Sequence, residues 1–384
     1  MNTQFYTMCR SKSFLATQRG LSLIELMVAM TIGAVLIFGA TEVYLNSRKS
    51  YAVSESVARL QETARYAMSV IEPDVRMAGY WGLLKGGGWL AGSRLQTQPV
   101  GGTVAAGAAA NICGDNFALD VETDLQSDNN AYTLSPTRKA GCNALTDIDT
   151  GIAWNTNPVT TADTLTVRRA SVFQSALTAG MVQVCANRIN GFLFSSGAGC
   201  PLPLPLPIWE LHNLIVDAYY IDRASAQQLA GLPSLRRKTL ATVGGAPVFR
   251  DQEIIAGVED MQIQFGIDPT TSINTVLPAA IATRYVNGDY VAASGVPANS
   301  QIVSVRIWLL VRADAAEPGF TDDRVYTYGD RLVATGTTGD LNAAGSAGMA
   351  YQPAANPDAS IMGPRHVRRL LISRTIQVRN AEGT

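Results

Sequence analysis

One carboxylate stands near the start of a long apolar stretch, where an ionised side chain is unusual. Glu25 belongs to the apolar run from Leu21 to Leu45, which begins directly after Gly20. A carboxylate in an apolar helix is costly unless it is paired, for example with an amine. We therefore interpret Glu25 as a functional residue. The alternative is a plain anchor whose carboxylate reaches the membrane interface, which is how we interpret Glu42 at the other end of the run.

Five cysteines set the redox chemistry that the chain can perform. Cys9 precedes the apolar run, whereas Cys113, Cys142, Cys185 and Cys200 follow it. In an oxidising compartment these four could form disulfides, and three pairings are possible. We favour Cys113–Cys142 and Cys185–Cys200, because each pair closes a loop of modest size.

The other polar residues do not form a recognisable catalytic set. The chain has no C-x-x-C motif and two histidines, His212 and His366, neither of them near a cysteine. We therefore expect neither a metal site nor a cofactor. His212 is interpreted as a packed or surface side chain rather than a general base. The acidic groups at 120–124 and 322–323 lack the signature of a calcium-binding loop. We expect a protein that is not an enzyme.

The charge balance does not suggest a nucleic-acid partner. The chain has 30 Lys+Arg and 31 Asp+Glu, which gives a net charge of −1. Loss of residues 1–20 would remove three basic residues and leave 27 against 31, a net charge of −4. The short basic clusters at 236–238 and 365–369 are interpreted as solvent-exposed faces. No basic stripe of the kind that binds nucleic acid is present in the sequence.

Residues 1–20 form a basic leader. They contain Arg10, Lys12 and Arg19, no acidic residue, and a glycine at position 20. A secretory signal has its cleavage site after the apolar stretch, whereas this glycine lies before it. Cleavage after Gly20 would leave the apolar helix on the mature chain. The positive-inside rule predicts a cytoplasmic N-terminus, with the residues beyond about 45 on the far side of the membrane.

The apolar run is long enough to cross a bilayer and continues as an amphipathic helix. About 20 apolar residues span a membrane, and residues 21–45 provide them. Pro73 is expected to end or bend the helix, which from Leu21 to Glu72 would be roughly 78 Å long. Beyond residue 45 an apolar stripe repeats every three or four positions: Val53, Val57, Leu60, Ala64, Ala67 or Met68, and Ile71.

The rest of the chain is predicted to form strands joined by long loops. Thr164–Arg168 and Leu214–Asp222 are the first candidates. Val258–Ile267, Gln301–Arg312 and Leu370–Val378 alternate apolar and polar residues, which is typical of an antiparallel sheet with one buried face. We expect an α+β fold in which a large antiparallel sheet packs on the amphipathic half of the helix.

The segment from Gly20 to Met30 resembles the class III prepilin signal of type IV pilins and type II secretion pseudopilins. The shared features are a basic leader, a glycine, four residues, a glutamate and an unbroken apolar helix. Phenylalanine is more common in the family at the position of Leu21. The resemblance implies that a prepilin peptidase cleaves after Gly20 and that Leu21 is N-methylated. It also implies that Glu25 neutralises the terminal amine of a neighbouring subunit in a filament.

Three further segments look like the PilW family of minor pilins, namely Arg76–Tyr80, Gly257–Asp268 and Arg368–Asn380. Residues 85–200 carry none of this resemblance. A pilin-like fold is implied, with a long N-terminal helical spine under a β-rich head. The implied parts are a cleaved leader at 1–20, a helix at 21–78 that crosses the membrane at about 21–45, and a periplasmic or extracellular head at 79–384.

The implied function is that of a minor pilin that primes assembly of a type IV pilus and stays near its tip, in the service of adhesion, twitching motility and DNA uptake. The implied partners are the prepilin peptidase, the major pilin, other minor pilins and a PilY-type tip adhesin. The protein would lie in the inner membrane with its head in the periplasm, and after assembly in the pilus. One alternative is a type II secretion pseudopilin of the J kind, whose close relatives are shorter. The other is a membrane-anchored periplasmic enzyme or binding protein.

Overall fold

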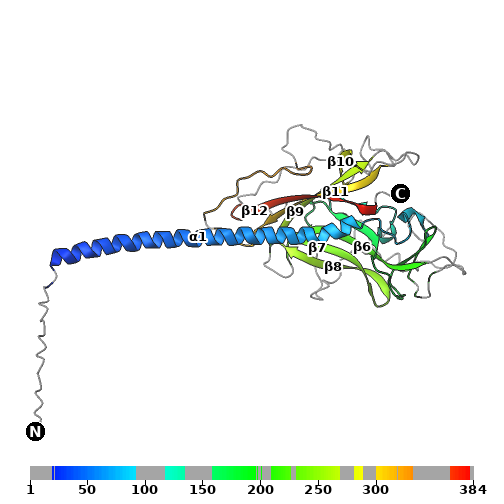
Figure 1. Ribbon diagram of the computed structural model, residues 1–384, viewed down its shortest axis with the longest axis horizontal. Helices are drawn as coiled ribbons and strands as arrows, with labels where there is room; N and C mark the ends of the chain where they lie inside the picture. Colours follow the sequence, from blue (N-terminus) through cyan, green and yellow to red (C-terminus); the bar gives the residue numbers. More distant parts are fainter. Residues whose placement is uncertain are drawn as a thin grey trace, which may run out of the picture. The chain divides into compact units, whose positions relative to one another are not determined.

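The computed structural model shows one long helix and two β-sheets (Figure 1). The chain divides into two compact units, Met1–Glu55 and Ser56–Thr384. The first unit contains the N-terminal part of the helix, and the second contains the remainder of the helix and both sheets. The structure describes residues 20, 22–91, 117–134, 158–195, 197, 200, 209–225, 231–268, 281–288, 300–317, 319–331 and 364–380.

Helix α1 runs from Leu23 to Arg76 and has 54 residues, so it is about 81 Å long. We expected Pro73 to end or bend it, but the helix continues past this proline. Proline cannot donate the hydrogen bond that would close the preceding turn. The last turn forms nevertheless, because the backbone N–H of Met77 donates to the Pro73 carbonyl (3.2 Å) and the side chains of Asp74 and Val75 are buried.

The first sheet has eight strands in the described part of the chain. Six follow one path in the order β1, β5, β4, β6, β3, β2, while β7 pairs with β6 and with β8. Strand β1 is parallel to β5, and the other pairs are antiparallel. The bounds are β1 Leu90–Ala91, β2 Leu125–Gln126, β3 Leu165–Ala170, β4 Gln183–Ala186, β5 Gly191–Phe194, β6 Glu210–Asp222, β7 Ser234–Val243 and β8 Ala246–Ala256.

The second sheet, within the residues that the structure describes, has four antiparallel strands in the order β10, β9, β11, β12. The five strands expected from the sequence are all present, as β3, β6, β9, β11 and β12. They are divided between two sheets, whereas their alternation indicated one. Short 3-10 helices lie at Gly87–Trp89 and Phe117–Leu119. The bounds are β9 Val258–Asp268, β10 Arg284–Asn287, β11 Gln301–Arg312 and β12 Arg369–Gln377.

The chain passes from the first sheet to the second at Gly257, the residue between β8 and β9. Its φ is +94°, a region that residues with a side chain rarely adopt. Its N–H donates to the Pro233 carbonyl at 2.6 Å, and its carbonyl accepts from the Arg312 N–H at 2.8 Å. Both backbone polar groups of the glycine therefore hold the corner between the sheets.

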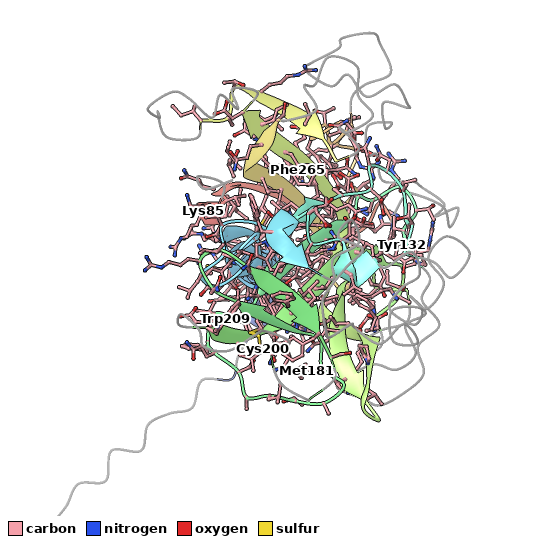
Figure 2. The ribbon with its side chains drawn as sticks, turned by 90° about the vertical axis from the view of Figure 1, so that its right-hand side faces the viewer. Lys85, Tyr132, Met181, Cys200, Trp209 and Phe265 are labelled. Carbon is pink, nitrogen blue, oxygen red and sulfur yellow. A yellow bond between two sulfur atoms is a disulfide. The ribbon has the colours of Figure 1, made fainter. Side chains whose placement is uncertain are left out.

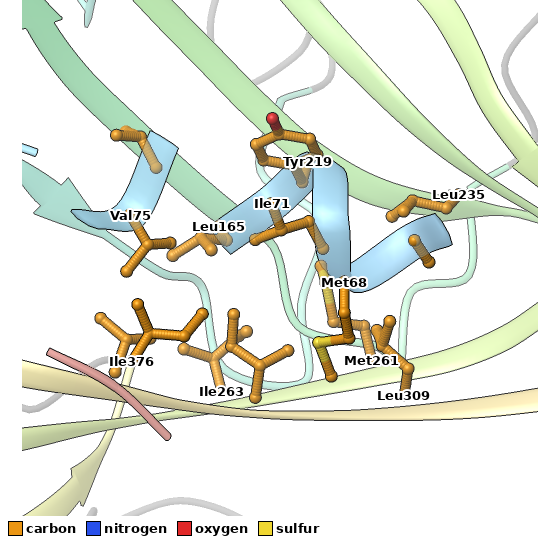
Figure 3. Close-up of a cluster of buried hydrophobic side chains, with 14 of the residues drawn as sticks. Met68, Ile71, Val75, Leu165, Tyr219, Leu235, Met261, Ile263, Leu309 and Ile376 are labelled. Atoms are coloured by element: carbon orange, nitrogen blue, oxygen red, sulfur yellow. The ribbon is translucent and has the colours of Figure 1, made fainter. Parts of the chain in front are cut away.

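The main hydrophobic core lies where the second half of α1 meets both sheets. Figure 3 shows Ile71 and Met68 of the helix beside Tyr219 of β6 and Met261 of β9. The C-terminal part of the predicted stripe is confirmed, whereas Val57 remains 36% exposed. The buried helix residues of this core are Leu60, Ala64, Ala67, Met68, Ile71 and Val75.

Strand β9 is buried on both of its faces, although alternation predicted one. Met261 and Ile263 belong to the core under α1, opposite Leu309 and Ile307 of β11. The intervening Gln262 is only 1% exposed. Side chains from the 317–331 segment cover that other face. Tyr326 and Tyr328 of this segment form a small apolar cluster with Leu310 of β11.

Candidate functional site

The N-terminal unit presents Glu25 in the first turn of α1. The Leu26 backbone N–H donates to the Ser22 carbonyl at 3.1 Å, so the helix is already formed at this point. A carboxylate is favoured at a helix N-terminus by the helix dipole. The Glu25 side chain is exposed, so it can form an ion pair with a cationic group of another molecule. Gly20 has no neighbour within 4 Å of its Cβ position, and Leu21 lies outside the described residues.

The first half of α1 carries an apolar surface that nothing within its own unit buries. Leu23 is 78% exposed and Phe38 is 77% exposed. The helix is long and apolar enough to cross a membrane, with a mean hydropathy of 2.2 over its most apolar window. Glu42 is also exposed. An apolar surface of this size needs a cover, which lipid or the helices of other subunits can provide.

At the other end of α1, Asp74 fixes the last turn to the first sheet. Its carboxylate accepts hydrogen bonds from Arg169 Nη2 at 2.7 Å and from the Tyr219 hydroxyl at 2.5 Å. The Arg237 guanidinium lies 4.0 Å from Asp74 and 3.8 Å from Asp217. Burial, and the negative charge of Asp74, raise the pKa of Asp217 to about 6. The polar cluster orients the helix end against β3, β6 and β7.

The first carboxylate of the Gly257–Asp268 segment holds the last strand. Glu259 occupies a register shift between β9 and β11, as the extra residue of a bulge. Its carboxylate accepts from Arg369 Nε at 2.6 Å, and Arg312 lies 3.6 Å away. Arg369 also donates to Asp322 at 3.3 Å. Asp322 in turn accepts from the Tyr326 hydroxyl at 2.8 Å, so the network connects β9, β12 and the 317–331 segment.

The next carboxylate, Asp260, holds the same segment at a second point. It accepts from Arg331 Nη2 at 2.7 Å and from the Tyr328 hydroxyl at 2.5 Å, and Arg331 Nε makes a further contact. Arg331 also donates to the Thr161 carbonyl at 2.7 Å. The acidic pair Glu259-Asp260 is therefore structural, since each carboxylate has an arginine partner.

Both basic clusters that we interpreted as solvent-exposed are partly buried, so that interpretation is wrong. Arg236 is 0% exposed and Lys238 is 1% exposed, while Arg369 of the second cluster is 4% exposed. Arg236 donates to Asp251 at 3.1 Å across the β7–β8 pair. Burial lowers the pKa of Lys238 to about 8, although the Asp251 carboxylate opposes that shift. Sequence proximity could not reveal these partners, because they come from a neighbouring strand.

One disulfide is present among the described residues. Cys185, at the third position of β4, is bonded to Cys200, and their Cα atoms are 5.9 Å apart. This is one of the two pairs that we favoured. Figure 2 shows Cys200 in the same part of the head as Trp209 and Met181. Cys113 and Cys142 lie outside the described residues, so their pairing stays a prediction.

His212 is a packed residue, as we expected. It is 1% exposed, and its Nδ1 lies 2.7 Å from the Ser171 carbonyl. Its Nε2 lies 3.3 Å from the Glu210 carboxylate, and the ring meets Tyr80 edge-on. Among the residues that the structure describes, no group of three or more His, Cys, Asp or Glu side chains is arranged to hold a metal ion.

The residues that sequence analysis missed are the polar ones that join distant segments. Asp74 received no assignment, although an acid directly after a proline at a helix end was a visible anomaly. Asp322 was considered only as part of an acidic group without a calcium-loop signature, and Arg331 received no assignment. The available signal was an acidic pair, Glu259-Asp260, inside a predicted apolar strand.

Comparison with known proteins gives two family matches on separate parts of the chain. The family model for type IV pilus-assembly protein W matches residues 218–380. The model for the prokaryotic N-terminal methylation motif matches residues 15–41. The first match contains the Gly257–Asp268 and Arg368–Asn380 segments, and the second contains Gly20, Leu21 and Glu25.

Among solved structures, a type IV-like pilin from Thermus thermophilus is similar at 14% sequence identity. The match covers 57% of this chain and 78% of the pilin, with a TM-score of 0.22. The search of curated proteins gave no match.

Proposed function

Because the chain is a type IV pilus-related pilin with a PilW domain and an N-terminal methylation motif, we propose that it is a minor pilin that primes pilus assembly and stays at the pilus tip. Its partners would be the major pilin and other minor pilins, with a large tip adhesin as a further candidate. Before assembly it would stay in the inner membrane, with its head in the periplasm. The observation that carries the proposal is an exposed apolar helix that begins with a processing motif and contains Glu25.

The first step of the proposal is processing. Peptidase cleavage after Gly20 would remove the basic leader and create a new amino terminus on Leu21. Leu21 would then be N-methylated, and the match of residues 15–41 to the N-terminal methylation motif supports this step. The apolar run from Leu23 onward would remain on the mature protein and hold it in the membrane until assembly.

The second step is insertion into the filament. In a bundle of apolar helices, an isolated carboxylate and an isolated ammonium each cost several kcal/mol, and pairing recovers much of that cost. Glu25 would therefore neutralise the amino terminus of a neighbouring subunit and set the axial position of this chain. The apolar side chains of α1, exposed in the isolated chain, would then be covered by neighbouring helices.

The third step is recognition by the head. The N-terminal helix supplies the general filament contact, and the head must decide which neighbours this subunit accepts. Its two sheets would provide a surface for that purpose, and buried ion pairs of Asp260 with Arg331 and of Glu259 with Arg369 stabilise the second of them. We propose a structural subunit and no catalytic step for this chain, which the family match at residues 218–380 supports.

A substitution of Glu25 tests the proposal. In cells that depend on this subunit for pili, Glu25→Ala should be processed normally, but its amount in sheared pili should fall by about tenfold or more. Glu42→Ala is the matched control, because it removes a carboxylate from the same helix near the other boundary of the apolar run. It should be incorporated like the wild type.

Two results would contradict this account. Normal incorporation of Glu25→Ala would remove the role of carboxylate pairing. Recovery of the wild-type protein only in a type II secretion pseudopilus, with no effect of its deletion on piliation, would support the pseudopilin alternative instead.

A further inference from the structure

Four oxygen atoms without a hydrogen-bond partner gather beside β9 in the described part of the head. They are Ser127 Oγ and Asn129 Oδ1 of the 127–130 segment, Gln262 Oε1 of β9 and Asp330 Oδ1 of the 317–331 segment. Gln262 is 1% exposed, Asp330 is 3% exposed and Ser127 is 4% exposed. A buried polar atom without a partner is costly, so such a group in one place needs an explanation.

Hydrogen bonds link Gln262 to Asp330 through Asn130, and the Asn129 side chain also bonds to Asp330. Asn130 Nδ2 donates to Asp330 Oδ2 at 2.5 Å, and Gln262 Nε2 donates to Asn130 Oδ1 at 3.4 Å. Asn287 Nδ2 lies 3.3 Å from Asp330 Oδ2. Ser127 Oγ would lie 2.3 Å from a Cβ at Gly288, the residue after Asn287, so Ser127 lies beside the end of β10.

The orientation of the Gln262 amide is set by its neighbours and leaves its oxygen as the free atom. Gln262 Nε2 faces two acceptors, the Met261 carbonyl at 3.1 Å and Asn130 Oδ1. Rotating the amide would place oxygen against oxygen, so its Oε1 must point away from them. The carboxylate and amide oxygens can only accept, and the described part of the chain supplies no donor to these particular atoms.

Three aspartates lie near the four free oxygens. Asp163, Asp260 and Asp330 are all buried in this region, and they are respectively 1%, 1% and 3% exposed. Arg331 satisfies Asp260. Asp163 accepts the backbone N–H groups of Asn130 and Ile263, both at 2.7 Å, which supply partial charges but no cation.

From this geometry we propose that the oxygen cluster Ser127, Asn129, Gln262 and Asp330 binds a calcium ion. Calcium takes oxygen ligands from carboxylates, amide carbonyls and water in a flexible arrangement of six to eight, which matches one carboxylate with several neutral oxygens. Magnesium requires a stricter octahedron and retains its waters. The ion would connect the 127–130 segment to β9 and to the turn at Asp330. Asp330 would be the one carboxylate among the four proposed ligands, and the other three would bind the ion through neutral oxygens.

Thermal unfolding of the full-length mature protein in detergent tests the proposal. After removal of divalent ions with EGTA, addition of excess CaCl2 should raise the Tm by about 5 °C or more. Excess MgCl2 should raise it by less. An unchanged Tm on addition of calcium, or an equal shift with magnesium, would overturn the assignment.

Two variants and a control localise the effect. Asp330→Asn should abolish the calcium shift, and in EGTA it should be at least as stable as the wild type, because it removes a buried negative charge. Gln262→Met should weaken the calcium dependence by about tenfold while preserving side-chain volume. Asp314→Asn is the control, since its carboxylate is half exposed and pairs with Arg59. It should retain the full shift, and a full calcium shift in Asp330→Asn would contradict the proposed ligand set.

Discussion

Arg169 of β3 donates to the Asp74 carboxylate of α1 at 2.7 Å, although the two residues are 95 positions apart in the chain. The contact fixes the last helical turn to the first sheet, just after a proline that would otherwise weaken it. The Tyr219 hydroxyl binds the other oxygen of the same carboxylate. The Asp74 carboxylate therefore fixes the C-terminal end of α1 relative to strands β3 and β6 of the first sheet.

Replacing Asp74 by alanine should destabilise the head by about 3 kcal/mol, because Arg169 would be left without its carboxylate in a largely buried site. Urea unfolding of the mature protein in detergent measures this. Asp314→Ala, at an exposed ion pair with Arg59, should cost less than about 1 kcal/mol. Similar small losses in both variants would show that the Asp74 cluster does not hold the helix.

Gly257→Ala should destabilise the junction of the two sheets by about 2 kcal/mol, because a φ of +94° strains any residue with a side chain. Its new Cβ would also lie 3.1 Å from the Arg312 carbonyl. Gly244→Ala is the comparison, at φ +59° in the β7–β8 turn with no atom within 4 Å of its Cβ position. That change should cost about 1 kcal/mol, and a larger loss there would argue against the importance of the Gly257 corner.

Asp217 should make stability depend on mildly acidic pH. Its pKa in the folded protein is raised to about 6 by burial and by the charge of Asp74, above the ordinary value of 3.8. Between these two values the folded state binds more protons than the unfolded state, so stability from this group falls as pH rises.

The measurement compares wild type with Asp217→Asn, which cannot ionise. On lowering the pH from about 7 to about 5, the unfolding free energy of the wild type should increase relative to the variant. A difference that is independent of pH, or one that changes in the opposite direction, would contradict the raised pKa of Asp217.

The elements with a periodic pattern could be predicted from the sequence. The stripe from Leu60 to Ile71 predicted the buried helix face, because side chains three and four residues apart share one side of a helix. Alternation predicted β9 and β11 in the same way. The processing motif at Gly20 was equally direct, since it depends only on local order and spacing.

Long-range polar contacts could not be predicted in the same way. Arg236 and Lys238 seemed solvent-exposed because charged residues are seldom buried, yet Asp251 of the next strand pairs with both. Strand pairing decides such contacts, and no local pattern encodes it. The division into two sheets was not predicted either. The chain passes from one sheet to the other at Gly257, and the positive φ of this glycine cannot be recognised from the sequence alone.

The central claim is that this chain is a processed pilin, and the mass of its amino-terminal peptide tests it most directly. Purified protein should begin at Leu21, with one methyl group on the amino terminus and none of residues 1–20. An amino terminus at Met1, or cleavage at any bond other than Gly20–Leu21, would contradict the account.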